Sequence, residues 1–327
     1  MTALSLRGFA AASIGLAGLG CAATPERVDP IDETVISLLG QPLPAPAIDR
    51  EARARMETQL AEARRAYDAA PTDADSIIWL GRRTAYLGRY REAIAIYTRG
   101  IALHPDDARL YRHRGHRYLT VRALDSAIAD FERAYRLVAG RPDEVEPDGQ
   151  PNARGIPVST LNSNIRYHLG LAHYLKGDFE AALPLYREDV AARVNDDMLV
   201  ATSHWLYMTL RRLGRDEEAA RVLDPIGPDL EVIENEAYRR LLRFYRGELT
   251  EAELLAAPAE GDPVLQNVTV SYGVGNWHLS NGRPDEARAV FERILESPQW
   301  AGFGYLAAEA EVARWGAAGG LTSETAP

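Results

Sequence analysis

The chain has 327 residues, a length that suggests two domains or an elongated stack of repeats, because one compact core rarely grows beyond about 250–300 residues. Its formal net charge of −10 argues against a nucleic-acid partner, which needs a surplus of Lys and Arg to neutralise phosphates. The hydrophobic content of 46% is too high for general disorder, so we expect a folded protein.

The first residues have the layout of an export signal. Arg7 is followed by a weakly apolar run from Gly8 to Gly20, which is too short to span a membrane. Cys21 stands where this run ends, and it is the only cysteine of the chain, so no intrachain disulfide can form. Gly20 and Cys21 resemble the end of the lipobox of bacterial lipoproteins, in which the cysteine is acylated.

This resemblance implies that residues 1–21 are a signal peptide and that Cys21 is lipidated. The protein would then be a membrane-anchored lipoprotein of the cell envelope, at the outer membrane or on the periplasmic side if the bacterium has two membranes. Two alternatives stay open. Cleavage at Cys21-Ala22-Ala23 without acylation would give a soluble periplasmic or secreted protein, and an unprocessed N-terminus would give an intracellular one.

Residues 22–48 are predicted to be an extended tether, because prolines break regular elements and stiffen the chain. These prolines are Pro25, Pro30, Pro42, Pro44 and Pro46. An apolar patch, Val35 to Leu39, is expected to dock only transiently. Residues 50–69 are predicted to form a charged amphipathic helix that caps the N-terminal side of the domain that follows.

A repeated pattern runs through the rest of the chain, in which a turn glycine is followed five residues later by an alanine. The pairs are Gly88–Ala93, Gly177–Ala182, Gly214–Ala219, Gly247–Ala252 and Gly282–Ala287. A sixth copy has Arg122 in place of the glycine and leads to Ala127. The six alanines are 34, 55, 37, 33 and 35 residues apart, so the period is close to 34 with one insertion.

This pattern resembles the tetratricopeptide repeat (TPR), whose period is 34. The first unit carries Leu80, Gly81, Gly88, Ala93, Tyr97, Gly100 and Pro105 at the positions that the family prefers. The resemblance covers about residues 70–300 and implies an all-α fold, a TPR-like α–α superhelix of antiparallel helix pairs, A and B. The solenoid is expected over residues 49–316. Its predicted repeats are about 74–107, 108–141, 163–196, 200–232, 233–260 and 268–300.

Three further segments complete the prediction. The insertion, at about residues 140–160, holds four prolines and four acidic residues, and it is either a passive surface loop or a segment that covers part of the groove. Residues 303–315 are predicted to form a final helix that caps the last repeat. Residues 317–327 are small and polar and are expected to be disordered.

In TPR proteins helix A lines a concave groove, so the resemblance implies that side chains on that face bind a partner. The candidates are Arg82, Arg109, Arg112, His116, Tyr167, Tyr174, His204 and Met208. Because Arg pairs well with carboxylates, the four basic members predict a protein or peptide partner with an acidic segment or a free C-terminus. The alternative is that acids of the chain itself, such as Asp75 or Asp106, neutralise the arginines.

No catalytic residue, cofactor or metal site is predicted, because the sequence has no nucleophile elbow, phosphate loop or His-Glu-x-x-His motif. We therefore expect a non-catalytic protein–protein interaction scaffold of the cell envelope. His113 and His116 are three residues apart on a predicted helix and could face one ligand together with His204. An enzyme or a binder of a metal or small ligand is thus one alternative, and an intracellular adaptor is another.

Overall fold

Helices make up nearly all the regular structure in the computed structural model, which describes residues 32–256 and 263–322. In chain order they are α1 (Arg50–Ala69), α2 (Ala74–Tyr86), α3 (Tyr90–Leu103), α4 (Ala108–Thr120), α5 (Leu124–Val138), α6 (Leu161–Lys176), α7 (Phe179–Ala192), α8 (Asp196–Arg212), α9 (Asp216–Val222), α10 (Glu236–Tyr245), α11 (Glu251–Ala256), α12 (Pro263–Ser280), α13 (Pro284–Ile294) and α14 (Phe303–Thr322). The all-α prediction is confirmed.

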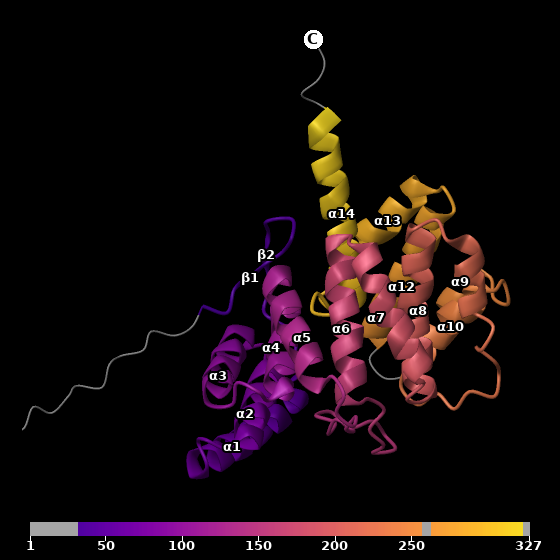
Figure 1. Cartoon of the computed structure of the whole chain (residues 1–327). Helices are drawn as coiled ribbons and strands as arrows, with labels where there is room; N and C mark the ends of the chain where they lie inside the picture. The colour runs from indigo at the N-terminus through magenta and orange to yellow at the C-terminus, as the bar shows by residue number, and fades with distance from the viewer. Residues whose placement is uncertain (1–31, 257–262, 323–327) are drawn as a thin grey trace, which may run out of the picture. The chain divides into compact units, whose positions relative to one another are not determined.

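After α1, consecutive helices form six pairs, α2/α3 to α12/α13, and neighbouring pairs pack against each other (Figure 1). The first helix of a pair corresponds to the expected helix A and the second to helix B. Three of the A helices, α6, α8 and α12, begin earlier than the repeat spacing suggests, at Leu161, Asp196 and Pro263.

The turn inside each pair needs a left-handed backbone. Gly88, between α2 and α3, has φ 82°, which glycine adopts without steric cost. Arg122 occupies the same place between α4 and α5 with φ 64°, where a side chain is disfavoured. The pattern therefore located the turn correctly even where the glycine is replaced, and the contacts of the Arg122 side chain explain the replacement.

The helices of a pair approach closely because a glycine of helix A receives an aromatic ring of helix B. A Cβ atom added to Gly81 would lie 2.4 Å from Cε1 of Tyr97, a distance that real Cβ contacts do not reach. Three other pairs repeat the contact with the same spacing: Gly115–Phe131, Gly170–Tyr186 and Gly275–Phe291. The glycine and the aromatic residue thus form one structural unit in four of the six repeats.

The described part of the expected tether, residues 32–48, is packed on the helices. β1 (Val35–Ile36) pairs with β2 (Pro42–Leu43), and Val35 is only 2% exposed. Trp300 donates its indole N–H to the carbonyl oxygen of Pro44 at 2.8 Å. The Glu33 carboxylate accepts the backbone N–H groups of Arg91 and Glu92 in the first turn of α3. Apolar burial and these hydrogen bonds stabilise a packed structure here despite the prolines. Pro42 is tolerated because it lies in an edge strand, which needs no N–H group from it. The expectation of a free tether is therefore wrong for these residues.

The last helix also differs from expectation. α14 extends to Thr322, so residues 317–322, which we expected to be disordered, are helical. It packs against α12 and α13 of the last pair but also against α6 of the third pair. Its buried residues include Leu306, Ala307 and two glutamates, Glu309 and Glu311. α14 therefore does more than cap the end, because it lies against the A helices of two distant pairs.

The side chain of Arg122 joins the second pair to α14. Its Nη2 lies 2.7 Å from Oε2 of Glu309, and both side chains are almost fully buried, at 3% and 1% exposure. The remaining guanidinium hydrogens go to the carbonyl oxygens of Thr120 and Trp300, and the ring of Trp300 lies against the guanidinium. A buried ion pair is tolerated only when its hydrogen-bonding groups are satisfied, as they are here.

Candidate functional site

The side chains expected to face a partner are carried mainly by α4 and α6. Asp107 begins α4 by accepting the backbone N–H of Arg109, and Thr160 begins α6 by accepting that of Ser163. These residue types are favoured N-caps because they satisfy free N–H groups at a helix start. The caps fix where each helix begins, and so they fix the register that turns Arg112 of α4 and Asn164 of α6 toward the insertion.

The insertion, residues 139–160, supplies a carboxylate to this face. Oε2 of Glu146 lies 3.0 Å from Nε of Arg112 and accepts a hydrogen bond of 3.0 Å from the Asn164 amide. Nε2 of His113 lies 3.8 Å from its other oxygen. Arg112 is 8% exposed, and burial lowers its pKa while the charge of Glu146 opposes that effect. We call the group of Arg112, His113 and Asn164 the anion site.

The residues after Glu146 continue along α2. Arg82 donates to the carbonyl oxygen of Pro147 and Arg83 to that of Gly149, both at 2.8 Å. Gly149 is close to the helix, since an added Cβ would lie 1.9 Å from the hydroxyl of Tyr86. Of the two alternatives for the insertion, the structure therefore has the one in which it covers part of the groove.

Arg109 lies at the edge of the site and is half-exposed. It forms ion pairs of 2.6 Å with both Asp75 and Asp107, and these partners raise its pKa. Asp106 pairs instead with Arg133, at 2.9 Å. Acids of the chain itself thus neutralise Arg109 and Arg112, as the alternative interpretation held, and Glu146 is the partner that it did not name.

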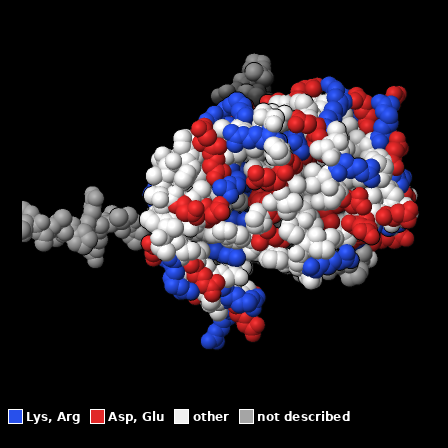
Figure 2. Space-filling model, turned by 60° about the horizontal axis from the view of Figure 1, so that its bottom comes forward, with Lys and Arg blue, Asp and Glu red and all other residues white. Residues whose placement is uncertain are grey.

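The charges of the surface are mixed. Figure 2 shows acidic and basic side chains interspersed over one face of the molecule. Most ion pairs on the described surface join Arg to a nearby Asp or Glu, such as Arg133 with Asp106. Exposed pairs of this kind contribute little to stability. The pair of Arg112 with Glu146 is buried, so it differs electrostatically from these exposed pairs.

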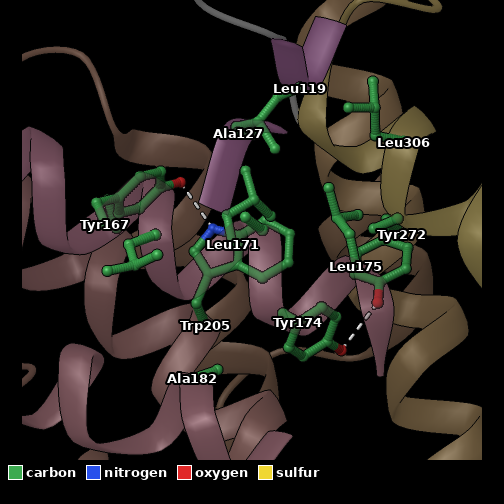
Figure 3. Packing of buried hydrophobic residues seen from close by; sticks show 14 of the residues in the cluster. Leu119, Ala127, Tyr167, Leu171, Tyr174, Leu175, Ala182, Trp205, Tyr272 and Leu306 are labelled. Carbon is green, nitrogen blue, oxygen red and sulfur yellow. Dashed lines mark hydrogen bonds between the residues drawn. The ribbon is translucent and has the colours of Figure 1, made fainter. Parts of the chain in front are cut away.

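The aromatic and aliphatic candidates belong to the core. Tyr174 and Met208 are 0% and 1% exposed, His204 is 1% and Tyr167 is 6%. The Tyr167 hydroxyl accepts a hydrogen bond of 2.7 Å from Trp205, and the Tyr174 hydroxyl one of 2.8 Å from that of Tyr272, both drawn in Figure 3. In this conformation a partner cannot reach these four side chains, because they are buried between helices. α8 and α12 cover the two tyrosines, and α10 covers His204.

The histidines are separated from one another. His116 packs against the rings of His168 and Phe303, at 4.7 and 5.6 Å, whereas His204 packs between Tyr238 and Tyr245. Burial lowers the pKa of His116 well below its ordinary value and that of His204 to about 3, so both are neutral. Within the residues that the structure describes, no three His, Cys, Asp or Glu side chains are grouped so as to hold a metal ion.

A cavity of about 320 Å³ opens beside His116. Its lining residues come from α4, α12, the starts of α10 and α14 and the loops that precede these two helices: His116, Glu234, Asn235, Ala237, Tyr238, Thr269, Ala301, Gly302 and Phe303. Burial raises the pKa of Glu234, whose carboxylate accepts a hydrogen bond of 2.6 Å from Asn152 of the insertion. The cavity combines aromatic walls with a few polar groups, a composition common in ligand sites.

The charges of the insertion are a sequence signal for its covering role. Four acids in the insertion, Asp143, Glu144, Glu146 and Asp148, stand close in sequence to a repeat rich in arginine. Complementary charge therefore favoured contact over a passive loop. Which of the four acids enters the anion site depends on backbone pairing, since Val145 bridges to Thr160 and holds Glu146 beside α4.

The predicted lipid anchor cannot be compared with the described structure. Cys21 and the rest of the expected signal lie outside the described residues. Among the helices that are described, none has the length and apolar character needed to cross a bilayer.

Residues 80–142 match the sequence profile of the tetratricopeptide repeat family. No curated protein sequence matches the chain. Solved structures similar to it include YrrB, described as a TPR protein with an unusual peptide-binding site, at 17% identity and a TM-score of 0.40 over 76% of this chain and 97% of that one. Naa15/Naa10 bound to HypK-THB has 16% identity and a TM-score of 0.35, over 74% and 34% of the two chains. The TPR domain of P58(IPK) has 14% and 0.28, over 80% and 85%.

Proposed function

Because this chain is a tetratricopeptide repeat protein, we propose that it is a non-catalytic scaffold of a bacterial cell envelope. It is held at the membrane through an acylated Cys21 and binds a protein or peptide partner on the face formed by its A helices. The repeat architecture supports the interaction role, and the resemblance of residues 20–21 to a lipobox supports the anchor.

The observation that carries the binding role is the cavity beside His116. It is open on the A-helix face, where the core fills most other candidate positions, and its volume of about 320 Å³ accommodates one or two side chains of a peptide. Tyr238 and Phe303 offer aromatic walls, and Thr269 and Asn235 offer hydrogen-bonding groups. Tyrosine and other aromatic side chains are enriched where protein partners bind tightly.

The test is to fill the cavity and measure partner capture. Ala301 lines the cavity, and in Ala301→Trp the indole should occupy it. Ala181→Trp, at a partly exposed alanine of helix B in α7, is the matched control. Wild type and control should capture the same protein from solubilised membranes of the source bacterium, and the purified partner should bind Ala301→Trp at least about tenfold more weakly, a loss of about 1.4 kcal/mol. Equal binding by all three proteins would show that the partner does not bind at the cavity.

The anchor has its own test. The wild-type chain should partition into detergent after expression in a bacterium, because acyl chains bring membrane affinity. Cys21→Ser should release it into the aqueous phase. Mass spectrometry that finds a mature N-terminus at Ala23 or Thr24 without acyl groups would show a soluble exported protein instead.

A further inference from the structure

We propose that the insertion is an intramolecular ligand of the A-helix face, and that an extended acidic peptide of the partner displaces it and binds to the same groups. The inference rests on the proposed partner-binding function and names the chemistry of the partner. The arrangement of Glu146 and the two carbonyl groups that follow it carries the inference.

Three acceptor groups that follow one another closely in the insertion each contact an arginine. The Glu146 carboxylate meets Arg112, the Pro147 carbonyl meets Arg82 and the Gly149 carbonyl meets Arg83. Two of the three contacts use backbone carbonyls, which any extended peptide offers at the same spacing. One carboxylate with carbonyls one and three residues later is therefore sufficient to reproduce them.

The anion site requires an occupant with a negative charge. Arg112 is almost fully buried, and Glu146 is the carboxylate paired with it among the described residues. This burial is measured with the insertion in place, and a peptide that replaces the insertion buries the guanidinium again. A buried charge without a partner is strongly unfavourable. A peptide that takes the place of the insertion must therefore bring a carboxylate of its own, so a neutral or basic segment cannot compete.

Polar contacts hold the insertion in place, and its own apolar side chains contribute little. Val145 is 64% exposed and Ile156 is 48% exposed. A cavity of about 190 Å³ lies where the insertion meets α2 and α4, lined by Trp79 and the half-exposed Arg109 among others. An incoming peptide can begin to bind at that cavity before the insertion leaves.

The binding equilibrium follows from tethering. A segment attached to its own site acts at an effective concentration in the millimolar range, so a free peptide competes poorly with it. If the site is open less than about a tenth of the time, the apparent Kd of a partner rises at least about tenfold. Removing the insertion should therefore lower the apparent Kd by the same factor.

The experiment uses a labelled synthetic peptide with the sequence of residues 143–150 as the probe, and fluorescence anisotropy as the measurement. In one variant residues 141–158 are deleted, which leaves Ala139, Gly140, Ser159 and Thr160 as a link equal in length to the His104–Asp107 link between α3 and α4. This variant should bind the peptide at least tenfold more tightly than the wild type does.

Two matched peptides test the role of the carboxylate. The peptide with Gln in place of Glu146 should not bind, whereas the peptide with Gln in place of the exposed Glu144 should bind as the parent does. If the deletion does not fold, as judged by circular dichroism, the full-length Glu146→Gln variant replaces it, with Glu144→Gln as control. A folded protein that binds no peptide, or binds the two Gln peptides equally, overturns the inference.

The captured partner separates this inference from the proposed function. If the wild type binds the partner through the cavity and the deletion binds it no more tightly, the inference fails and the proposed function stands. If the deletion binds the acidic peptide and neither form captures a partner, the proposed function fails although the anion site is as described.

Discussion

The contact of Gly81 with Tyr97 sets how closely helices A and B of the first repeat approach. Gly81→Ala would place a methyl group 2.4 Å from the ring, and Tyr97, which is 1% exposed, has no room to yield. We expect a loss of about 1–3 kcal/mol in the free energy of unfolding, as overpacking typically gives. Urea denaturation measures it.

Gly316→Ala is the control for this substitution. Gly316 lies in α14 with no atom within 4 Å of its added Cβ, so alanine should be neutral or stabilise the helix by about 0.5–1 kcal/mol. A Gly81→Ala protein as stable as the wild type would show that the repeat does not depend on this close approach.

Buried neutral histidines make the fold sensitive to acid. Burial lowers the pKa of His204 to about 3 in the folded protein, from an ordinary value of 6.5. Between these two values the unfolded chain binds a proton that the folded chain does not. The free energy of unfolding therefore keeps its full value above pH 6.5 as far as this residue is concerned. Below that pH it falls by up to about 1.4 kcal/mol per pH unit.

His204→Phe should remove that part of the pH dependence. The variant's free energy of unfolding, measured by urea denaturation between about pH 6.5 and 4.5, should fall less steeply than that of the wild type. His168→Phe should act in the same direction, because burial lowers the pKa of His168 to about 3 as well. Identical slopes for wild type and variants would contradict the assignment of neutral histidines in the folded state.

At the scale of elements, the sequence predicted the helices better than the segments between them. The repeat of glycine and alanine predicted the positions of the turns, and the charged periodicity of residues 50–69 predicted α1 with both its ends. These features are local, because each depends on steric limits within one pair of helices. The basic cluster was also predicted as a cluster, through Arg82 and Arg112.

What covers that face could not be predicted in the same way. The packing of residues 32–48 and of α14 depends on contacts between residues far apart in sequence, such as Trp300 with Pro44. The repeat pattern says only that helix A faces the concave side. It does not say that helices of other pairs pack over that side, as α12 does over Tyr174, which makes Tyr174 a core residue.

At the scale of the whole molecule, the pair of Arg122 with Glu309 changes how damage should spread. In an open repeat stack each repeat touches only its neighbours, so a local defect stays local. Here the two partners are 187 residues apart in sequence, and the pair joins the turn between α4 and α5 to α14. The second pair and the last helix are therefore coupled directly, although the helices from α6 to α13 separate them in the chain.

Arg122→Ala tests this coupling. It leaves Glu309 buried without its partner and should cost about 3–5 kcal/mol. Arg122→Gly loses the same pair but removes the strain of φ 64°, so it should be more stable than Arg122→Ala by about 1 kcal/mol. Arg133→Ala, which removes the exposed pair with Asp106, should cost less than about 1 kcal/mol.

Hydrogen exchange then shows where protection is lost. In Arg122→Ala we expect faster exchange in α4 and α5 and, equally, in α14, because one buried ion pair holds both together. α10 and α11 touch neither partner. Their exchange rates should therefore change by no more than the loss of global stability explains. Loss of protection confined to the second repeat and its sequence neighbours would mean that the molecule behaves as an open stack and that α14 contributes only to the last pair.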